Sequence, residues 1–536
     1  MFNTTTSLGK DVTPDDQVVT VVCKPGDWST TSPFIPPSTK RLRSRNNKMS
    51  PSPLDAERAK SELSAREIAY VLHQGQAQVE RLERLEALLV ADPIFNHETM
   101  NYLPRGEQYK RATQMAARVE IIARRNKLSE EDTEQLRLVF QGMTSCAAST
   151  TLHTLMFIKN LGLLFTEDQQ AKWMQLAKEW KMVGCYAQTE LGHGSNVRGL
   201  ETTATFVPET DEFEIHSPTL SSIKWWPGAL ARTANFGVVY ARLILHGKDY
   251  GVHNFMVQLR DLETHEPRPG CTMGDIGPKI GFNNVDNGYC KFDRVRIPRD
   301  QMAMRLATVD RTGKYSKNKG VPQEIMYFTM LQTRMGFVRM NAMALGKACT
   351  IAIRYSAVRE QGYDANDPKS NTELKRHERM SLNAVGAAGN QIDAFTKELS
   401  EQIHRGNVAM LNVGHAMSCG LKVLASDIGC AGIETARRVS RYDDEQRTCS
   451  SAMRLLRIGA NRHACILLGD NVQTVTAEGE NYVLSLQTAR TLLKVLGAFR
   501  AGSPLPDSMK YIANIDQAVP TPRARSAQQW LEPATY

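Results

Sequence analysis

A stretch with the composition of a cofactor-binding loop runs from Gly184 to Glu201. Three glycines, at positions 192, 194 and 199, lie among Thr189, Glu190, His193 and Ser195. Because glycine has no side chain, backbone N–H groups here can approach a planar or phosphate-bearing ligand while short side chains donate to it. The pattern therefore indicates a cofactor site. An ordinary glycine-rich loop explains the same composition, since isolated glycine patterns are weak signals.

Composition limits the classes of protein that remain. The chain has 536 residues, of which 41% are hydrophobic and 23% charged. These values are typical of globular proteins with roughly three or four domains. The apolar runs Val238–Leu245 and Tyr482–Leu496 are too short or too charged to cross a bilayer, so we expect no transmembrane helix. We find no secretory signal pattern, and the end Pro533–Tyr536 carries no Ser-Lys-Leu peroxisomal address.

The cysteines are scattered and form no Cys-x-x-Cys pair. Neither a zinc site nor a disulfide framework leaves such spacing, so we predict buried free thiols in a reducing compartment and no metal. The ten positions are 23, 146, 185, 271, 290, 349, 419, 430, 449 and 465.

The net charge of +9 suggests a polyanionic partner, either nucleic acid or a phosphate-rich coenzyme. The basic cluster Lys40–Lys48 lies in a tail rich in Thr, Ser and Pro, where its charges are expected to stay solvated. We therefore expect no nucleic-acid partner.

Helical patterns occupy the first part of the chain. Residues 1–50 have the composition of a flexible extension. Apolar residues at helical spacing then predict an N-terminal helical domain over residues 51–183. Its expected helices are Ala56–Val90, Gly106–Arg125, Ser129–Phe140, capped by Ser129 with Asp132 three residues on, and Thr166–Lys181, with a buried segment at Ala147–Leu163.

At Gly184 the pattern changes to strands, which predicts a β domain over residues 184–310. Without a βαβ rhythm this domain is not a Rossmann fold, which disfavours nicotinamide binding. The expected strands are the hairpin Thr202–Val207 and Glu212–His216, Ala234–Leu245 paired with Val252–Leu259 around a turn at Gly247–Gly251, and Tyr289–Ile297, ending at Pro298.

Helices return after residue 320, and long helices joined by loops predict a bundle over residues 320–505, followed by a short tail, 506–536. The expected helices run from Pro322 to Glu360, from Leu374 to His404, from Met410 to Arg438 and from Tyr482 to Gly497. The fold class is therefore α+β, mostly α, in the order α, β, α.

Several motifs resemble those of the acyl-CoA oxidases, the FAD enzymes of fatty-acid β-oxidation related to acyl-CoA dehydrogenases. Gly184–Glu201 and Ser221–Gly228 are similar to the family's flavin-binding segments. The resemblance runs from about residue 55 to 500 and implies an N-terminal helical domain, a small β-barrel and a C-terminal helical bundle. Further matches are Ala91–Phe95, Asp286–Tyr289, Lys347–Arg359, Glu478–Asn481 and Leu486–Arg490.

The resemblance implies two flavin contacts. Thr189 matches a threonine whose hydroxyl and backbone contact the flavin ring, and Gly228 matches a flavin-contacting glycine of a Trp-Trp-Pro-Gly motif. The adjacent Trp225 and Trp226 either flank the isoalloxazine or pack on a strand.

The resemblance also places a substrate entry in the loop. Gly192, Gly194 and Ser195 would shape the entry of the thioester, although the family more often has Thr at the last position. His193 is expected to be structural, because the family's mechanism gives it no proton to move.

The implied chemistry requires a carboxylate. The α-hydrogen of an acyl thioester is weakly acidic, so a general base must remove it while the flavin accepts the β-hydrogen as hydride. Glu478 matches the family's base, and Glu480 is the competing candidate. From the residues alone, either could be a first-turn residue of the helix that follows.

The chain departs from the family's pattern in two places. The interval 438–463 is long, basic and poor in glycine where the family has a Cys-Gly-Gly-His-Gly-Tyr type loop, and we interpret it as a retained intron or a frame error in the gene model. The chain also ends soon after Gly502, so we expect the family's second C-terminal helical domain to be missing.

Three functional hypotheses follow. The first is an FAD-dependent acyl-CoA oxidase, a peroxisomal homodimer that converts fatty acyl-CoA and O2 to trans-2-enoyl-CoA and H2O2. The second is an acyl-CoA dehydrogenase with another electron acceptor, which consumption of O2 without an added acceptor would exclude. The third is a catalytically impaired homologue that binds acyl-CoA or a partner, which a yellow flavoprotein would exclude.

Overall fold

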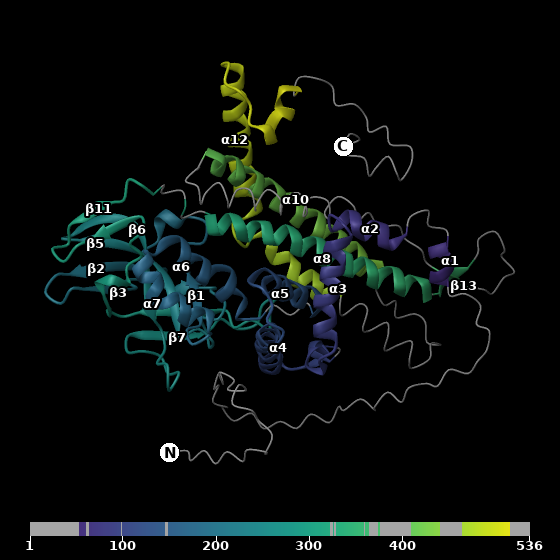
Figure 1. Cartoon of the computed structure of the whole chain (residues 1–536), viewed down its shortest axis with the longest axis horizontal. Helices are drawn as coiled ribbons and strands as arrows, with labels where there is room; N and C mark the ends of the chain where they lie inside the picture. Colours follow the sequence, from purple (N-terminus) through teal and green to yellow (C-terminus); the bar gives the residue numbers. More distant parts are fainter. Residues whose placement is uncertain are drawn as a thin grey trace, which may run out of the picture.

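The molecule has two sheets at one end and long helices that run away from them (Figure 1). The computed structural model describes residues 53–59, 64–97, 99–144, 148–321, 325, 328–358, 360–363, 373–375, 409–439 and 464–514. The predicted fold class is confirmed, with N-terminal helices, a central β domain and C-terminal helices in that order. The domain boundaries drawn from the sequence stay predictions, and the extension 1–50 lies outside the described residues.

The first N-terminal helices are shorter than the sequence pattern predicted, whereas α4 Arg105–Arg125 matches its prediction and α5 Glu130–Thr144 extends beyond its own. The single helix expected over 56–90 is wrong, because Ser64 begins a new helix with a capping box to Glu67 and Gly75, at φ 129°, separates it from the next. The predicted cap of Ser129 on the backbone of Asp132 is confirmed at 3.0 Å. The helices are α1 Pro53–Ala59, α2 Ala65–Leu72, α3 Gln76–Val90, α4 Arg105–Arg125, α5 Glu130–Thr144, α6 Ile158–Leu164 and α7 Glu167–Lys178, with a π-helical turn His153–Phe157 before α6.

The β domain consists of two main sheets around one core. Strands β1, β5, β2, β3 and β9 lie in that order in the larger sheet, with β6 beside β5, and β4, β8 and β7 form the smaller sheet. Their buried faces enclose apolar side chains such as Phe213, Val239 and Phe292. The strands are β1 Gly184–Ala187, β2 Thr203–Val207, β3 Glu212–His216, β4 Lys224–Trp225, β5 Phe236–Leu245, β6 Lys248–Gln258, β7 Cys271–Asp275, β8 Gly288–Phe292, β9 Val295–Pro298, β10 Ala307–Val309 and β11 Tyr315–Lys317.

Two strand predictions need correction, while the β2–β3 hairpin is confirmed. The turn placed at 247–251 is instead a two-residue turn at His246 and Gly247, both with positive φ, and residues 248–251 continue β6. The strand expected over 289–297 is two strands in different sheets, because Arg294 adopts a φ of 52° between them. The first turn was thus predicted too long, and the second break was not predicted.

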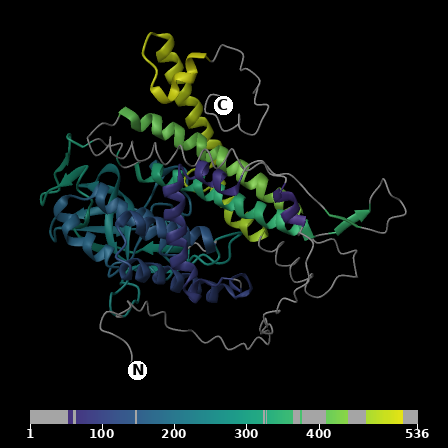
Figure 2. The ribbon, with the colours of Figure 1, turned by 45° about the vertical axis from the view of Figure 1, so that its right-hand side comes forward.

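The C-terminal helices pack along one another and against the sheet. Helices α8 and α10 lie side by side, and α12 crosses them and projects from the body (Figures 1 and 2). One core joins Phe157, Val238 of β5, Val338 of α8 and Ile433 of α10, so the β domain and the bundle are packed together. The elements are α8 Phe328–Val358, β12 Glu360–Tyr363, β13 Glu373–Lys375, α10 Ala409–Val439 and α12 Asn481–Arg500; residues 464–472 are also helical, and the 3-10 helix η9 Asp507–Asn514 follows α12.

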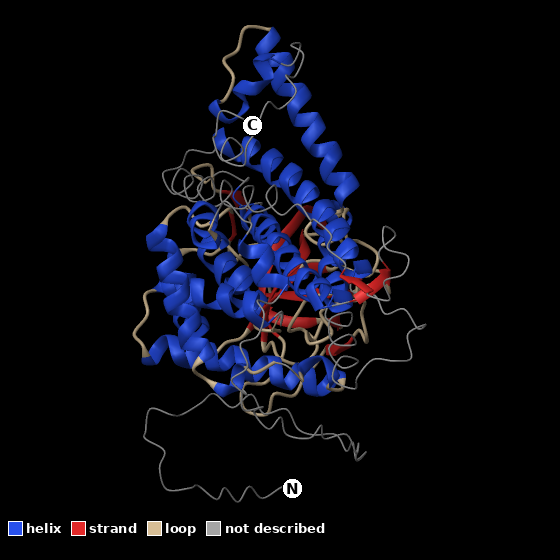
Figure 3. Ribbon diagram, turned by 90° about the vertical axis from the view of Figure 1, so that its right-hand side faces the viewer, coloured by secondary structure: helices blue, strands red, loops and turns tan. Residues whose placement is uncertain are grey.

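Two C-terminal predictions changed. The first residues of the helix expected over 374–404 belong to the strand β13, and the rest of that range up to 404 lies outside the described residues. Pro322, the expected start of the preceding helix, also lies outside them. Within the described parts, the segment Val413–Arg437 of α10 is long and apolar enough by composition to cross a membrane, which the sequence survey overlooked. This segment packs against α8 and α12, as the core helix of a bundle does. Figure 3 shows these helices in front of the strands.

A buried histidine connects the N-terminal helices to the start of β1. The Nδ1 atom of His153 accepts from the backbone N–H of Gly184 at 3.0 Å, so its Nε2–H donates to the carbonyl of Ala177, also at 3.0 Å. The ring stacks on Phe157, and burial lowers the pKa of His153 from 6.5 to about 4. The imidazole is therefore neutral in the folded protein at neutral pH.

His153 should make the protein sensitive to acid. In the unfolded chain its pKa is 6.5, so between pH 6.5 and 4 the unfolded state binds a proton that the folded state excludes. The stabilisation is thus complete above pH 6.5 and is lost as the pH falls toward 4, by at most about 3 kcal/mol. Urea unfolding of wild type and His153→Gln at pH 7 and pH 5 checks this. A variant that loses as much stability on acidification as wild type contradicts it.

Candidate functional site

Thr189 lies in a loop that a buried ion pair holds from both sides. The side chains of Lys224 and Glu190 are wholly buried, with Nζ and Oε1 3.0 Å apart. Lys224 also donates to the carbonyls of Gln188 at 3.2 Å and Tyr240 at 2.7 Å. The carbonyl of Thr189 itself accepts from the backbone of Trp225 at 3.0 Å. The strand β4 and the ion pair therefore fix the backbone on both sides of Thr189.

The Glu190 carboxylate organises the rest of the loop. It accepts from the backbone N–H groups of Glu201 at 2.8 Å and Thr202 at 2.9 Å, and from Nδ1 of His193 at 3.1 Å. Burial acts to raise the pKa of Glu190, but Lys224 and these hydrogen bonds outweigh it and lower the pKa. His193 thus belongs to the hydrogen-bond network of the loop, which agrees with the structural role expected for it.

Gly228 lies in a segment that Asp286 holds in an unusual backbone conformation. The segment has positive φ angles at Trp226 and Ala229. The buried carboxylate of Asp286 accepts from the backbone of Ala229 at 3.1 Å and from the backbone and hydroxyl of Thr233, both at 2.9 Å. It also accepts from the backbone of Arg232 at 2.9 Å. The sequence pattern places this aspartate in a motif but indicates no role for it, because its partners are distant in the sequence.

The neighbours of Gly228 leave little space for a side chain there. A Cβ atom at this position would lie 3.0 Å from Cδ1 of Leu152 and 3.3 Å from Cγ1 of Val285. The two tryptophans differ: Trp225 stacks on Tyr289 with ring centres 5.8 Å apart, while Trp226 is 51% exposed. Trp225 therefore packs within the β domain, and Trp226 remains accessible.

The two candidate glutamates have different environments. Glu480 is the N-cap of α12 and accepts from the backbone of Val483 at 3.2 Å. Glu478 lies outside the helix, half-buried, and its carbonyl accepts from Nε of Arg334 at 2.7 Å. Burial raises the pKa of the Glu478 carboxyl, and the charges of Arg334 and Lys422 partly offset this rise. Glu478 is thus a desolvated carboxylate, whereas Glu480 has a capping role.

Tyr186 of β1 brings the two predicted motifs together. It precedes Thr189 by three residues, and its pKa is raised well above its usual value. The causes are burial, the neighbouring Tyr240 and the charge of Glu478. Electrostatic interaction of this kind requires proximity. Glu478 therefore lies close to the strand that leads into the Thr189 loop.

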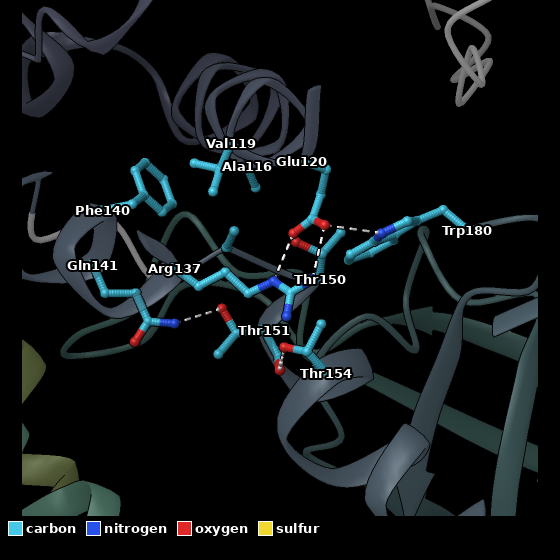
Figure 4. Close-up of a pocket in the computed structure, with 11 residues that line it drawn as sticks. Ala116, Val119, Glu120, Arg137, Phe140, Gln141, Thr150, Thr151, Thr154 and Trp180 are labelled. Atoms are coloured by element: carbon cyan, nitrogen blue, oxygen red, sulfur yellow. Dashed lines mark hydrogen bonds and ion pairs between the residues drawn. The ribbon is translucent and has the colours of Figure 1, made fainter. Parts of the chain in front are cut away.

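A small pocket of about 30 Å³ lies elsewhere, among the N-terminal helices (Figure 4). An ion pair between Arg137 and Glu120, at 2.7 Å, lines it, and Nε1 of Trp180 donates to Glu120 at 3.3 Å. None of its lining residues is a predicted site residue. The pocket thus reflects packing of α4 and α5 and is separate from the chemistry at Glu478.

The described cysteines match the thiol prediction only in part. Within the described residues, no group of His, Cys, Asp and Glu has the arrangement of a metal site. No disulfide joins the seven described cysteines, and five of them are buried, but Cys430 is half-buried and Cys465 is exposed, contrary to the prediction. The unusual interval 438–463 lies outside the described residues from position 440 onward.

Comparison with known proteins gives a consistent family. Residues 64–183 match the model described as Acyl-coenzyme A oxidase N-terminal, and residues 327–440 match Acyl-CoA oxidase, C-alpha1 domain. The chain is 37% identical over 490 residues to peroxisomal acyl-coenzyme A oxidase 1 of Arabidopsis thaliana, covering 89% of this chain and 71% of the relative. It is 36% identical over 472 residues to the Rattus norvegicus protein of the same name, covering 86% of this chain and 69% of the relative.

Solved structures agree with this family. The chain resembles Arabidopsis thaliana acyl-CoA oxidase 1 with a TM-score of 0.78 and 37% identity, over 91% of this chain and 73% of that one. It also resembles acyl-CoA oxidase-2 of Caenorhabditis elegans, bound with FAD, ascaroside-CoA and ATP, with a TM-score of 0.73 and 32% identity. That match covers 86% of this chain and 68% of the other.

Proposed function

The chain belongs to the acyl-CoA oxidase family, and on that basis we propose which of its residues perform the family's reaction. The reaction is the FAD-dependent oxidation of a fatty acyl-CoA to trans-2-enoyl-CoA, with O2 reduced to H2O2, in the first step of peroxisomal β-oxidation. We assign the general base to Glu478 and flavin contacts to Thr189 and Gly228.

The residues around Thr189 suit a flavin. Within the described part of the chain, the half-buried hydroxyl of Thr189 makes no hydrogen bond, so it is free to bond a ligand. Gly194 has open space where a side chain would lie, and Trp226 offers an accessible aromatic ring beside Gly228. When bound there, FAD supplies the acceptor for the β-hydrogen. Thr189 would bond the isoalloxazine, and the backbone at Gly228 would contact it.

Glu478 would remove the α-proton. A base must be ionised to accept a proton, and catalysis is best when its pKa lies near the working pH. Burial raises the pKa of Glu478, which makes its carboxylate a stronger base, while Arg334 and Lys422 keep the ionised form accessible. The single observation that carries this assignment is the desolvated Glu478 carboxylate close to the strand that leads into the Thr189 loop.

Purified protein tests the proposal directly. We expect a yellow protein that releases H2O2 and consumes O2 when a fatty acyl-CoA is added without another electron acceptor. Flavin reduction without O2 consumption would favour a dehydrogenase, and a colourless protein would favour an impaired homologue. We further propose a homodimer and a peroxisomal location, the latter because the relatives are named peroxisomal. Sedimentation and cell fractionation check these two points.

Replacing Thr189 by Val should weaken flavin binding with little effect on folding. Val keeps the shape but removes the hydroxyl, and one hydrogen bond contributes about 0.5–1.5 kcal/mol. The dissociation constant for FAD should therefore rise roughly threefold to tenfold, as measured by flavin fluorescence on titration of the apoprotein. Thr350→Val is the matched control, because that hydroxyl is exposed and donates to the carbonyl of Gly346 in its own helix. Equal affinities of the two variants would remove Thr189 from the flavin site.

A further inference from the structure

Lys422 of α10 is a wholly buried lysine whose three donors all serve the segment that carries Glu478. Its Nζ donates to the carbonyl of Val475 at 3.0 Å, to the carbonyl of Gly479 at 2.8 Å and to Oδ1 of Asn481 at 2.8 Å. An ammonium group has three hydrogens, so its donor capacity is used completely. None of these acceptors belongs to α10 itself. The contacts therefore hold the turn at residues 475–481 rather than the helix.

A second cation holds the same turn from α8. Arg334 is 5% exposed and donates through Nε to the carbonyl of Glu478, while its NH1 approaches Nδ1 of His415 at 3.3 Å. Asn481 is held in turn by α10, since its Nδ2 donates to Oγ of Ser426 at 2.9 Å. In the described residues, no hydrogen bond is made by the Glu478 carboxylate. Hydrogen bonds thus hold the backbone at Glu478, while its carboxylate oxygens are left available to accept a proton.

The backbone at this turn needs such support. Glu478 has a φ of 56° and Gly479 a φ of 109°, both in the left-handed region. A residue other than glycine is strained in this region, and the conformation persists only where the surroundings fix it. A Cβ atom at Gly479 would lie 2.7 Å from Cδ2 of Leu484, so the turn has no room to relax on that side. Without Lys422, the carbonyls of Val475 and Gly479 would lose their buried donor.

We propose that Lys422 is a positioning residue for the base Glu478, holding its turn through the main-chain oxygens of Val475 and Gly479 and supplying a positive charge next to that turn. The inference rests on the proposed function, in which Glu478 takes the α-proton. The alternative is that Lys422 only stabilises the fold. A positioning role and a purely structural role predict different dependences of the flavin reduction rate on pH and on the presence of Glu478.

The charged groups around Glu478 set the expected pH dependence. Burial raises its pKa, Arg334 from α8 and Lys422 from α10 lower it, and the charge of Glu478 in turn contributes to the raised pKa of Tyr186 from β1. Glu480 lies in the same segment and interacts with Lys422. Removing the charge of Lys422 should raise the pKa of Glu478. The base is then protonated up to a higher pH, so the acidic limb of the pH–rate profile moves to higher pH.

The predicted shift of the acidic limb is tested by anaerobic single-turnover experiments. In these, a saturating fatty acyl-CoA reduces the flavin of the holoenzyme, and the rate is measured from pH 5 to 9. We expect Lys422→Met to slow reduction about 100-fold at neutral pH, as misplacement of a catalytic group by about 1 Å can do, with KM changed less than about threefold. Lys422→Gln keeps hydrogen-bond donors without charge, so it should be faster than the Met variant but show the same shift of the acidic limb. Lys494→Met, at an exposed lysine of α12, is the control and should match wild type.

A double-mutant cycle separates positioning from folding. In a Glu478→Gln background, Lys422→Met should slow reduction less than about threefold, because a positioning residue has nothing left to position. Faster amide exchange of residues 475–481 in Lys422→Gln would accompany the effect. An unmoved acidic limb in Lys422→Gln, or equal effects of Lys422→Met with and without Glu478, overturns the proposal. If Lys422→Met does not fold, the position of the acidic limb of the pH–rate profile of Lys422→Gln decides between the proposal and a purely structural role. A wild-type protein that does not reduce its flavin would overturn the proposed function and this inference together.

Discussion

The Glu478→Gln variant should bind flavin and fatty acyl-CoA but reduce the flavin about 10²- to 10⁴-fold more slowly than wild type, which is the contribution of a positioned general base. Glutamine has nearly the same shape as glutamate, and the backbone carbonyl of Glu478, which accepts from Nε of Arg334, is unchanged by the substitution. The fold should therefore survive the change. Stopped-flow measurement of the fading flavin colour under anaerobic conditions gives the rate.

Glu480→Gln is the matched control for this prediction. Glu480 is two residues away and caps α12, so its substitution should cost at most about 1 kcal/mol of stability and leave the reduction rate within about threefold. Glu478→Gln should also lose the acidic limb of the pH–rate profile, since the titrating base is gone. A fully active Gln variant at 478, or a larger loss at 480 than at 478, would reassign the base.

Lys224→Met is expected to be the most damaging of these substitutions for stability. It leaves the buried carboxylate of Glu190 without its cation, and breaking a buried pair from one side costs about 3–5 kcal/mol. The Gln188 and Tyr240 carbonyls lose a donor as well. Because these groups fix the backbone on both sides of Thr189, flavin should be lost before the protein unfolds. The midpoint of urea unfolding and the flavin content of the purified protein measure both effects.

Two further variants isolate the cause of that destabilisation. Lys172→Met removes a lysine from an exposed ion pair with Asp300, 3.2 Å long, and should change stability by less than about 1 kcal/mol. The double variant Lys224→Met with Glu190→Met removes both buried charges and should recover part of the loss. If the double variant is less stable than the sum of the single changes, the unpaired carboxylate is not the source of the damage.

The Asp286 interactions explain why the Trp-Trp-Pro-Gly segment is a rigid feature of the site. Its carboxylate holds three backbone N–H groups, of Ala229, Arg232 and Thr233. A carboxylate that accepts several N–H bonds fixes the chain as a helix cap does. The sequence places Asp286 in a motif but does not indicate its hydrogen-bond partners, because these residues lie more than fifty positions earlier in the chain. Long-range polar contacts of this kind have no periodic signal.

The resemblance to a family and the residue pattern each determined part of the site. Helical and strand periodicity gave the order α, β, α, since burial of one face imposes that periodicity directly. Motif matches selected Thr189, Gly228 and Glu478. They left Glu478 and Glu480 in competition, because an acidic pair before a helix looks the same whichever member caps it. The structure gives the cap to Glu480 and leaves Glu478 outside the helix.

What the sequence by itself determined is therefore the class of fold, the family and a short set of candidate residues. Only the tertiary structure decided which buried charges surround them: Lys224 beside Glu190, and Lys422 and Arg334 around the turn at Glu478. It also decided the breaks at Ser64 and Arg294, where a cap or a positive φ interrupts the predicted element, and the length of the turn at His246 and Gly247. The physical reason is the same in each case: periodicity reports which face of an element is buried, whereas the partner of a buried charge is set by which elements pack against it.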